Sequence, residues 1–238
     1  MNVEKGEIKL IIRQISDVLL INGGFLNNPG LYFGEMGLVL FFAKYARYTG
    51  NDLHLDYTYS LIEKIQNSLH MATPINYKQG LTGIGSAIEY MVQNGFIEAD
   101  TDEVLEEFDE KIFYTYNLQY LSIDEIKDVG YYAAWRINGA SVKKDPIKQT
   151  IIPQIEKNMH ERSVVPQWRQ SEKKTIQKCF AEKTYDRCLE LIAKNEFWTK
   201  DMGLQNGLAG WGISILTELD GDNSWLLLLP DELKYYQR

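Results

Sequence analysis

Three short glycine-rich segments constrain the fold of this chain more than any other feature. They read FGEMGLVL from Phe33, QGLTGIGSAIEYM from Gln79 and NGLAGWGISIL from Asn206. Each places glycines at the start of an otherwise apolar, helix-favouring run, although a glycine inside a helix costs about 1 kcal/mol relative to alanine. Because this costly pattern returns three times, it indicates an internal repeat.

The segments between these copies predict further helices. A weaker copy, VGYYAAWRI, predicts that Gly130 begins another apolar helix, and each interval between copies has room for one more helix. No segment shows the alternation of a strand, so the chain is expected to be all-α, with apolar helices inside and amphipathic helices outside. Apolar residues at helical spacing predict four amphipathic helices, over residues 8–19, 55–69, 100–113 and about 171–194.

Composition excludes several classes of protein. The chain of 238 residues carries 33 acidic and 25 basic side chains, a net charge of −8, which disfavours nucleic-acid binding. No apolar run is long enough to span a membrane, and the N-terminus is unlike a signal peptide. We therefore expect a cytoplasmic protein. Cys179 and Cys188 lie half a helical turn out of phase on one predicted helix, so they cannot share a metal, and their apolar neighbours Phe180, Leu189 and Ile192 indicate buried structural thiols.

The motifs GLYFGEMG (from Gly30), QGLTGIG (from Gln79) and GLQNGLAGWG (from Gly203) resemble the Gly-Leu-x-x-Gly-x-x-Gly pattern of the lanthionine synthetase C-like proteins. The resemblance implies an α/α toroid and a role in peptide modification. A complete toroid of seven hairpins, at about 48 residues each, would need roughly 340 residues, which is more than this chain has. The expected fold is therefore an incomplete toroid-like array of four or five hairpins, forming one domain over residues 1–238.

One segment, at about residues 139–170, fits this pattern poorly. It has three prolines between Lys143 and Lys174 and a basic excess, and Pro153 would suit a helix start that leaves Ile155 and Met159 on one face. We interpret it as a degenerate hairpin or a lid-like insertion, with a solvated loop as the alternative.

The resemblance does not extend to the metal site. Family members that close thioether rings resemble one another in a zinc site made by two cysteines and a histidine. The matching positions here carry NYKQG from Asn76 and KDMG from Lys200, so no ligand can be assigned, and no metal or other cofactor is expected. A zinc-free protein that binds a peptide or a partner enzyme in a peptide-modification system is the first functional hypothesis.

Polar residues near the predicted helix starts give the second hypothesis. Glu35, Asp128 and Asp201 are candidate catalytic residues, since two carboxylates could act as general acid and base on a glycosidic bond. The competing interpretation is that acidic residues favour helix N-termini and that aromatic residues belong to the core. The candidate ligand-binding residues are Tyr32, Tyr77, Thr82, Tyr132, Asn206 and Trp211.

An incomplete array also predicts an assembly. Its first and last inner helices would lack neighbours, so a homodimer or another protein partner is expected to cover them. The alternative is that the segment from Lys143 to Lys174 folds across the gap and keeps the protein monomeric. The apolar residues expected to be exposed are Leu38, Phe41, Phe42, Ile213, Leu216 and the run from Leu226 to Leu229.

Overall fold

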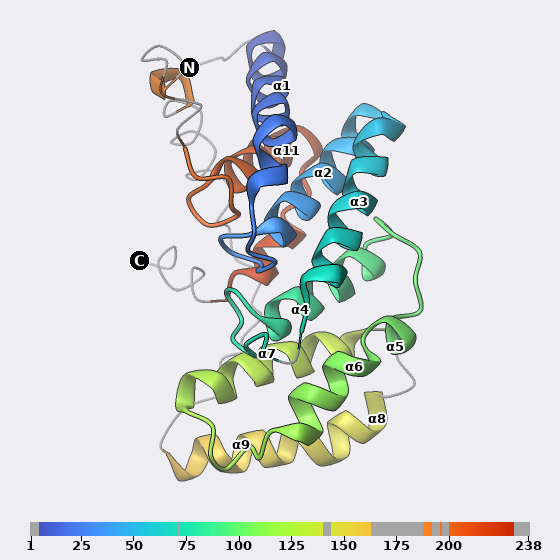
Figure 1. The fold of residues 1–238 in the computed structure, drawn as a ribbon, viewed down its shortest axis with the longest axis vertical. Coiled ribbons are helices and arrows are strands. Elements are labelled where there is room, and N and C mark those ends of the chain that lie inside the picture. Colours follow the sequence, from blue (N-terminus) through green and yellow to red (C-terminus); the bar gives the residue numbers. More distant parts are fainter. Residues whose placement is uncertain are drawn as a thin grey trace. The chain divides into compact units, whose positions relative to one another are not determined.

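The structure is a computed structural model that describes residues 5–70, 72–139, 144–162, 188–191, 196 and 200–230. Within these ranges every regular element is a helix and none is a strand, so the all-α prediction is confirmed (Figure 1). The chain divides into two compact units. Unit 1 comprises Met1–Leu69, Lys174–Leu226 and Glu232–Arg238, and unit 2 comprises His70–Lys173 and Leu227–Asp231. The prediction of a single domain stays a prediction.

Unit 1 is built from both ends of the chain. The helix α11 contacts both α1 and α2, and α2 contacts α3. The last glycine-started helix therefore packs beside the first one, and α1 packs against this last helix as well. The elements are α1 (Lys5–Asn22), η1 (Gly23–Phe25), α2 (Glu35–Thr49), α3 (Asp52–Ser68), α11 (Leu208–Asp220) and the start of η5 (Ser224–Leu228).

Unit 2 is continuous in sequence apart from a few C-terminal residues. Its central helix α7 packs against α4 on one side and against η3 and α9 on another. The elements are α4 (Leu81–Gln93), α5 (Thr101–Val104), α6 (Glu106–Asp109), the π-helix η2 (Glu110–Thr115), α7 (Ile123–Asn138), α8 (Lys144–Pro146), the π-helix η3 (Ile147–Ile151) and α9 (Ile152–Glu161).

The described part of the atypical segment is helical. Residues 144–162 form α8, η3 and α9, with proline in the first turn of α9. Ile155 and Met159 are buried on one face, as their spacing predicted. These helices pack against α7, and whether the segment is a degenerate hairpin or a lid-like insertion stays a prediction. Residues 163–170 lie outside the described residues.

The same kind of backbone hydrogen bond occurs in each of the three glycine loops. The residue after each capping glycine donates its N–H to the carbonyl seven positions earlier, so a loop of the same size closes on each helix start. A Cβ on Gly34 or Gly80 would overlap that carbonyl, which explains why glycine stands there. The bonds are Glu35 to Asn28 at 2.8 Å, Leu81 to Pro74 at 2.9 Å and Leu208 to Asp201 at 2.7 Å.

The weaker fourth copy does not follow this rule. Gly130 lies in the middle of α7 instead of at a helix start, so that prediction is wrong. The helix begins at Ile123 because Ser122 and Glu125 form a capping box, which satisfies two free N–H groups at this point. Asp128, expected near a helix start, consequently lies inside the helix.

Two of the predicted amphipathic helices are either interrupted or lie mostly outside the described residues. The helix expected over residues 100–113 is broken into α5, α6 and η2, with an interruption at Leu105 (φ −103°, ψ 12°). The helix expected at about 171–194 lies outside the described residues except for 188–191, which are helical. Cys188 is buried, as predicted, whereas Cys179 lies outside the described residues.

The predicted exposed edge is absent from α2 and α11. Leu38, Phe41, Phe42, Ile213 and Leu216 are fully buried, so the expectation that they meet water is wrong. The reason is that α11 lies against both α1 and α2. Of the run from Leu226 to Leu229, Leu228 and Leu229 are buried and Leu227 is exposed. The homodimer stays a prediction, but an exposed apolar edge on α2 and α11 no longer supports it.

Candidate functional site

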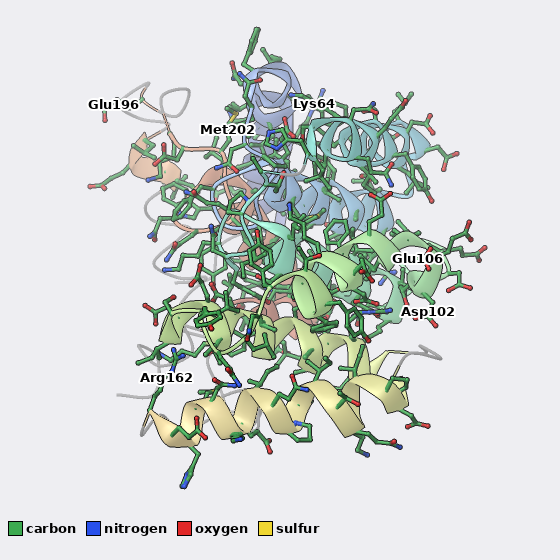
Figure 2. All side chains as sticks on the ribbon, turned by 60° about the horizontal axis from the view of Figure 1, so that its bottom comes forward. Lys64, Asp102, Glu106, Arg162, Glu196 and Met202 are labelled. Atoms are coloured by element: carbon green, nitrogen blue, oxygen red, sulfur yellow. The ribbon has the colours of Figure 1, made fainter. Side chains whose placement is uncertain are left out.

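Glu35, the first residue of α2, has a buried carboxylate that forms an ion pair with a lysine side chain. Its side chain is 1% exposed, and the Nζ of Lys64 in α3 lies 2.6 Å from its Oε1 atom. The same ammonium donates to the carbonyls of Gly24 and Leu26. Burial and the charge of Glu35 together raise the pKa of the neighbouring Tyr57. The charge of Glu35 is thus balanced by Lys64, which is labelled in Figure 2.

The other predicted residues of unit 1 lie at or near two neighbouring loops. The N–H of Gln205 donates to the carbonyl of Tyr32 at 2.9 Å, which joins the loop before α2 to the loop before α11. Tyr32 is buried, whereas Asp201 and Asn206 are exposed. Trp211 is buried in the first turns of α11. Unit 1 therefore brings Tyr32, Asp201, Asn206 and Trp211 to the same end as Glu35.

Two details mark this end of unit 1. The ammonium of Lys200 lies 5.0 Å from the ring centroid of Trp211, a cation–π contact. Asn206 has φ 56°, the one positive value at a non-glycine position within the described residues. Asparagine tolerates this left-handed conformation better than most residues do. It leaves the Asn206 side chain exposed immediately before the capping glycine of α11.

The predicted residues of unit 2 have structural contacts. The carboxylate of Asp128 accepts the backbone N–H of Tyr77 at 3.0 Å, and the buried hydroxyl of Thr82 donates to the carbonyl of Ile75. Burial is the main cause of a raised pKa at Tyr77. The ring of Tyr132 is fully buried, and its hydroxyl donates to Asp109 at 2.7 Å. Asp128, Thr82 and Tyr132 thus form hydrogen bonds within unit 2, and the side chain of Tyr77 is buried there.

Sequence reasoning missed a buried charge cluster in unit 2. Arg136 of α7 is completely buried and binds three carboxylates, from α4, α5 and α6. Burial alone would lower the pKa of Arg136, but the bonds and charges of its partners raise it overall. The sequence signal for this cluster is a charged residue within an apolar helical segment, Glu89 in SAIEYM and Arg136 in AAWRI. The contacts are Arg136 with Glu89, with Asp102 at 2.7 Å and with Asp109 at 2.8 Å.

A second missed cluster lies in unit 1. Lys44 of α2 is buried, and its Nζ contacts Asp222 Oδ2 at 2.8 Å, the Asp222 carbonyl at 2.9 Å and Asp220 Oδ2 at 3.2 Å. Although burial would raise the pKa of Asp222, hydrogen bonds from Lys44 and Ser224 hold it below its usual value. Lys44 thereby fastens the end of α11 to α2.

The described ranges contain no group of three histidine, cysteine or acidic side chains placed to hold a metal ion. Within the same ranges, no helix is both long and apolar enough to cross a membrane. Comparisons with protein-family models, curated proteins and solved structures found no match to this chain. The likeness to the lanthionine synthetase C-like proteins therefore rests on the glycine motifs alone and stays a prediction.

Proposed function

We propose that this chain is a zinc-free protein of the lanthionine synthetase C-like kind that binds a peptide or a partner enzyme in a peptide-modification system. One observation carries the choice of binding over catalysis. Glu35 is buried against Lys64 and Asp128 accepts a backbone N–H, so two of the three candidate acids have structural partners. Asp201 and Asn206 remain exposed in the loop before α11, the helix whose Trp211 ring centroid lies 5.0 Å from the ammonium of Lys200.

These groups suit peptide recognition. An exposed carboxylate and a side-chain amide can bind the N–H and carbonyl groups of a peptide, and a lysine ammonium can bind an acidic side chain. Glycoside hydrolysis instead needs two carboxylates that both reach the substrate. Glu35 does not reach solvent in this structure, which favours the binding hypothesis over the hydrolase alternative.

The test is selection from a displayed library of random peptides against the purified protein. Affinities of the enriched peptides, measured by fluorescence anisotropy, should fall at least about fivefold in Asp201→Asn and Asn206→Gly, since each removes a polar contact. Glu218→Gln is the matched control, because Glu218 is exposed in the last turn of α11, at the other end of the helix from this loop. Asn206→Gly keeps the left-handed backbone and removes only the amide.

Two results would contradict this proposal. One is the absence of any enriched peptide, or the enrichment of peptides whose affinity is unchanged in both variants. The other is turnover of 4-nitrophenyl glycosides that is lost in Glu35→Gln, which would favour the hydrolase.

A further inference from the structure

The sequence contains four Asn-Gly pairs, and the structure places them in different surroundings. An asparagine followed by glycine is prone to form a cyclic imide, because glycine has no Cβ to hinder attack of its nitrogen on the asparagine side chain. The reaction needs a glycine N–H that makes no hydrogen bond and an asparagine amide that is free to approach it. The pairs are Asn22-Gly23, Asn94-Gly95, Asn138-Gly139 and Asn206-Gly207.

Three of these pairs lie where a helix ends, and hydrogen bonds occupy their reacting groups. The last carbonyls of a helix have no partner in the next turn, so they accept bonds from the groups that follow. A group that already donates such a bond must release it before it can react. The bonds are Asn22 Nδ2 to Val18 O at 3.0 Å, Asn94 Nδ2 to Tyr90 O at 2.8 Å, Gly95 N to Val92 O at 3.0 Å and Gly139 N to Trp135 O at 3.1 Å.

Asn206-Gly207 differs because it lies where a helix begins. The loop before α11 supplies carbonyls to the three N–H groups that follow Gly207, whereas the Gly207 N–H makes no hydrogen bond within the described residues. The exposed amide of Asn206 makes none there either. Met202, in the same loop, is labelled in Figure 2. The three bonds are Leu208 N to Asp201 O at 2.7 Å, Ala209 N to Met202 O at 3.1 Å and Gly210 N to Gly203 O at 3.3 Å.

We propose that Asn206 is a site of spontaneous deamidation, at which the folded protein converts its own side-chain amide into a carboxylate. The Gly207 nitrogen loses its proton and attacks Cγ of Asn206. The new N–Cγ bond replaces the Cγ–Nδ2 bond, and the leaving amide nitrogen takes up the proton and departs as ammonia. Water then opens the cyclic imide at either carbonyl, which gives aspartate or β-linked isoaspartate. The positive end of α11 favours the negative charge on the attacking nitrogen.

The modification changes the loop in two ways. It adds a negative charge where the amide stood, and isoaspartate also inserts a methylene group into the main chain between Asp201 and Leu208. The hydrogen bond that joins these two residues depends on the number of backbone atoms between them. The isoaspartyl chain is therefore expected to lose this loop closure. The inference does not rest on the proposed function, because the chemistry needs neither a peptide nor a partner.

The test is incubation of the folded protein in neutral buffer, followed by peptide mass spectrometry, which detects the mass increase from amide to carboxylate. Asn138 is the matched control in the same molecule, because it is also exposed and followed by glycine, but the Gly139 N–H is bonded. We expect Asn206 to react at least about fivefold faster, the factor that corresponds to one backbone hydrogen bond. In concentrated urea both N–H groups are free, so the two rates should become similar.

Isoaspartate is detected separately, by enzymatic methylation of its carboxylate. The label should be lost in Asn206→Gly, which keeps the left-handed backbone without an amide, and it should persist in Asn138→Gly. Equal rates at Asn206 and Asn138 in the folded protein would overturn the inference. A faster reaction at Asn206 that persists unchanged in urea would do so as well, because its cause would then be the neighbouring sequence and not the fold.

Discussion

Arg136 of α7 connects four helices in the interior of unit 2. A single guanidinium reaches carboxylates on α4, α5 and α6, and all the groups involved are buried or nearly so. A planar fork with five donors suits this task, and lysine cannot reproduce it. Removing the guanidinium leaves Glu89 and Asp109 as buried charges without a counter-charge, which is far more costly than losing a surface pair.

We expect Arg136→Met to lower the free energy of unfolding by about 3–5 kcal/mol, because it breaks a buried ion-pair network. Chemical denaturation with urea measures the change. Lys157→Met is the control, since Lys157 is exposed and 3.9 Å from Glu161, and it should change stability by less than about 0.5 kcal/mol. Similar values for the two variants would contradict the structural role of Arg136.

The lowered pKa of Asp222 predicts how the stability of the protein depends on pH. Its pKa is lowered in the folded protein by hydrogen bonds from Lys44 and Ser224, against the effect of burial. A group of this kind stabilises the fold above its unfolded pKa, and the contribution is lost as the pH falls through its folded pKa. Asp222→Asn should therefore destabilise the protein by about 1 kcal/mol at pH 7, a value limited by the partial exposure of the carboxylate, and by much less at pH 3. Urea unfolding at both pH values checks this, and an equal effect at both would contradict it.

At the scale of elements, the glycine loops are the most testable feature. Gly80 caps α4, and a Cβ there would overlap the Pro74 carbonyl that accepts the first helix N–H. Gly80→Ala should lower the free energy of unfolding by about 2 kcal/mol or more, because the backbone itself must move. Gly6→Ala in α1 is the control, since nothing lies within 4 Å of an added Cβ, and it should be neutral or stabilising. Thermal unfolding followed by circular dichroism separates the two outcomes.

The glycine loops also show which helix starts could be predicted from the sequence and which could not. Local signals predicted the starts of α2, α4 and α11, because the glycine motif and the first helix bond lie within seven residues. The same motif failed at Gly130, where the Ser122 capping box determined the start. The Arg136 cluster escaped prediction because its partners lie 27 to 47 residues away.

The candidate site was predicted only in part, for a similar reason. The motif places Tyr32, Tyr77 and Thr82 near helix starts, but it does not indicate whether their side chains are buried or exposed. All three are buried, whereas Asp201 and Asn206 at matching loops are exposed. Exposure depends on contacts between loops, such as that of Gln205 with Tyr32, and these join residues far apart in the chain.

At the scale of the molecule, unit 1 depends on α1. The apolar face of this helix contacts α11, and Ile15 approaches Gly212. Deleting residues 1–22 should therefore expose α11 and raise amide exchange throughout α2, α3 and α11. Unit 2 contains none of the deleted residues, so α4 and α7 should keep their protection. Hydrogen exchange with mass spectrometry measures both units in one experiment, and loss of protection in both alike would contradict the division.

The discontinuity of unit 1 has a consequence for synthesis on the ribosome. Helices α1 to α3 emerge before unit 2, yet the apolar faces that α1 and α2 present to α11 have no covering helix until α11 itself has been made. At about 5–20 residues per second, the interval between Ser68 and Leu208 lasts roughly 7–30 s. The helices of unit 2 are consecutive, so they can bury their apolar faces while translation continues. The nascent N-terminal helices are thus the part of this protein that a chaperone has the longest time to bind.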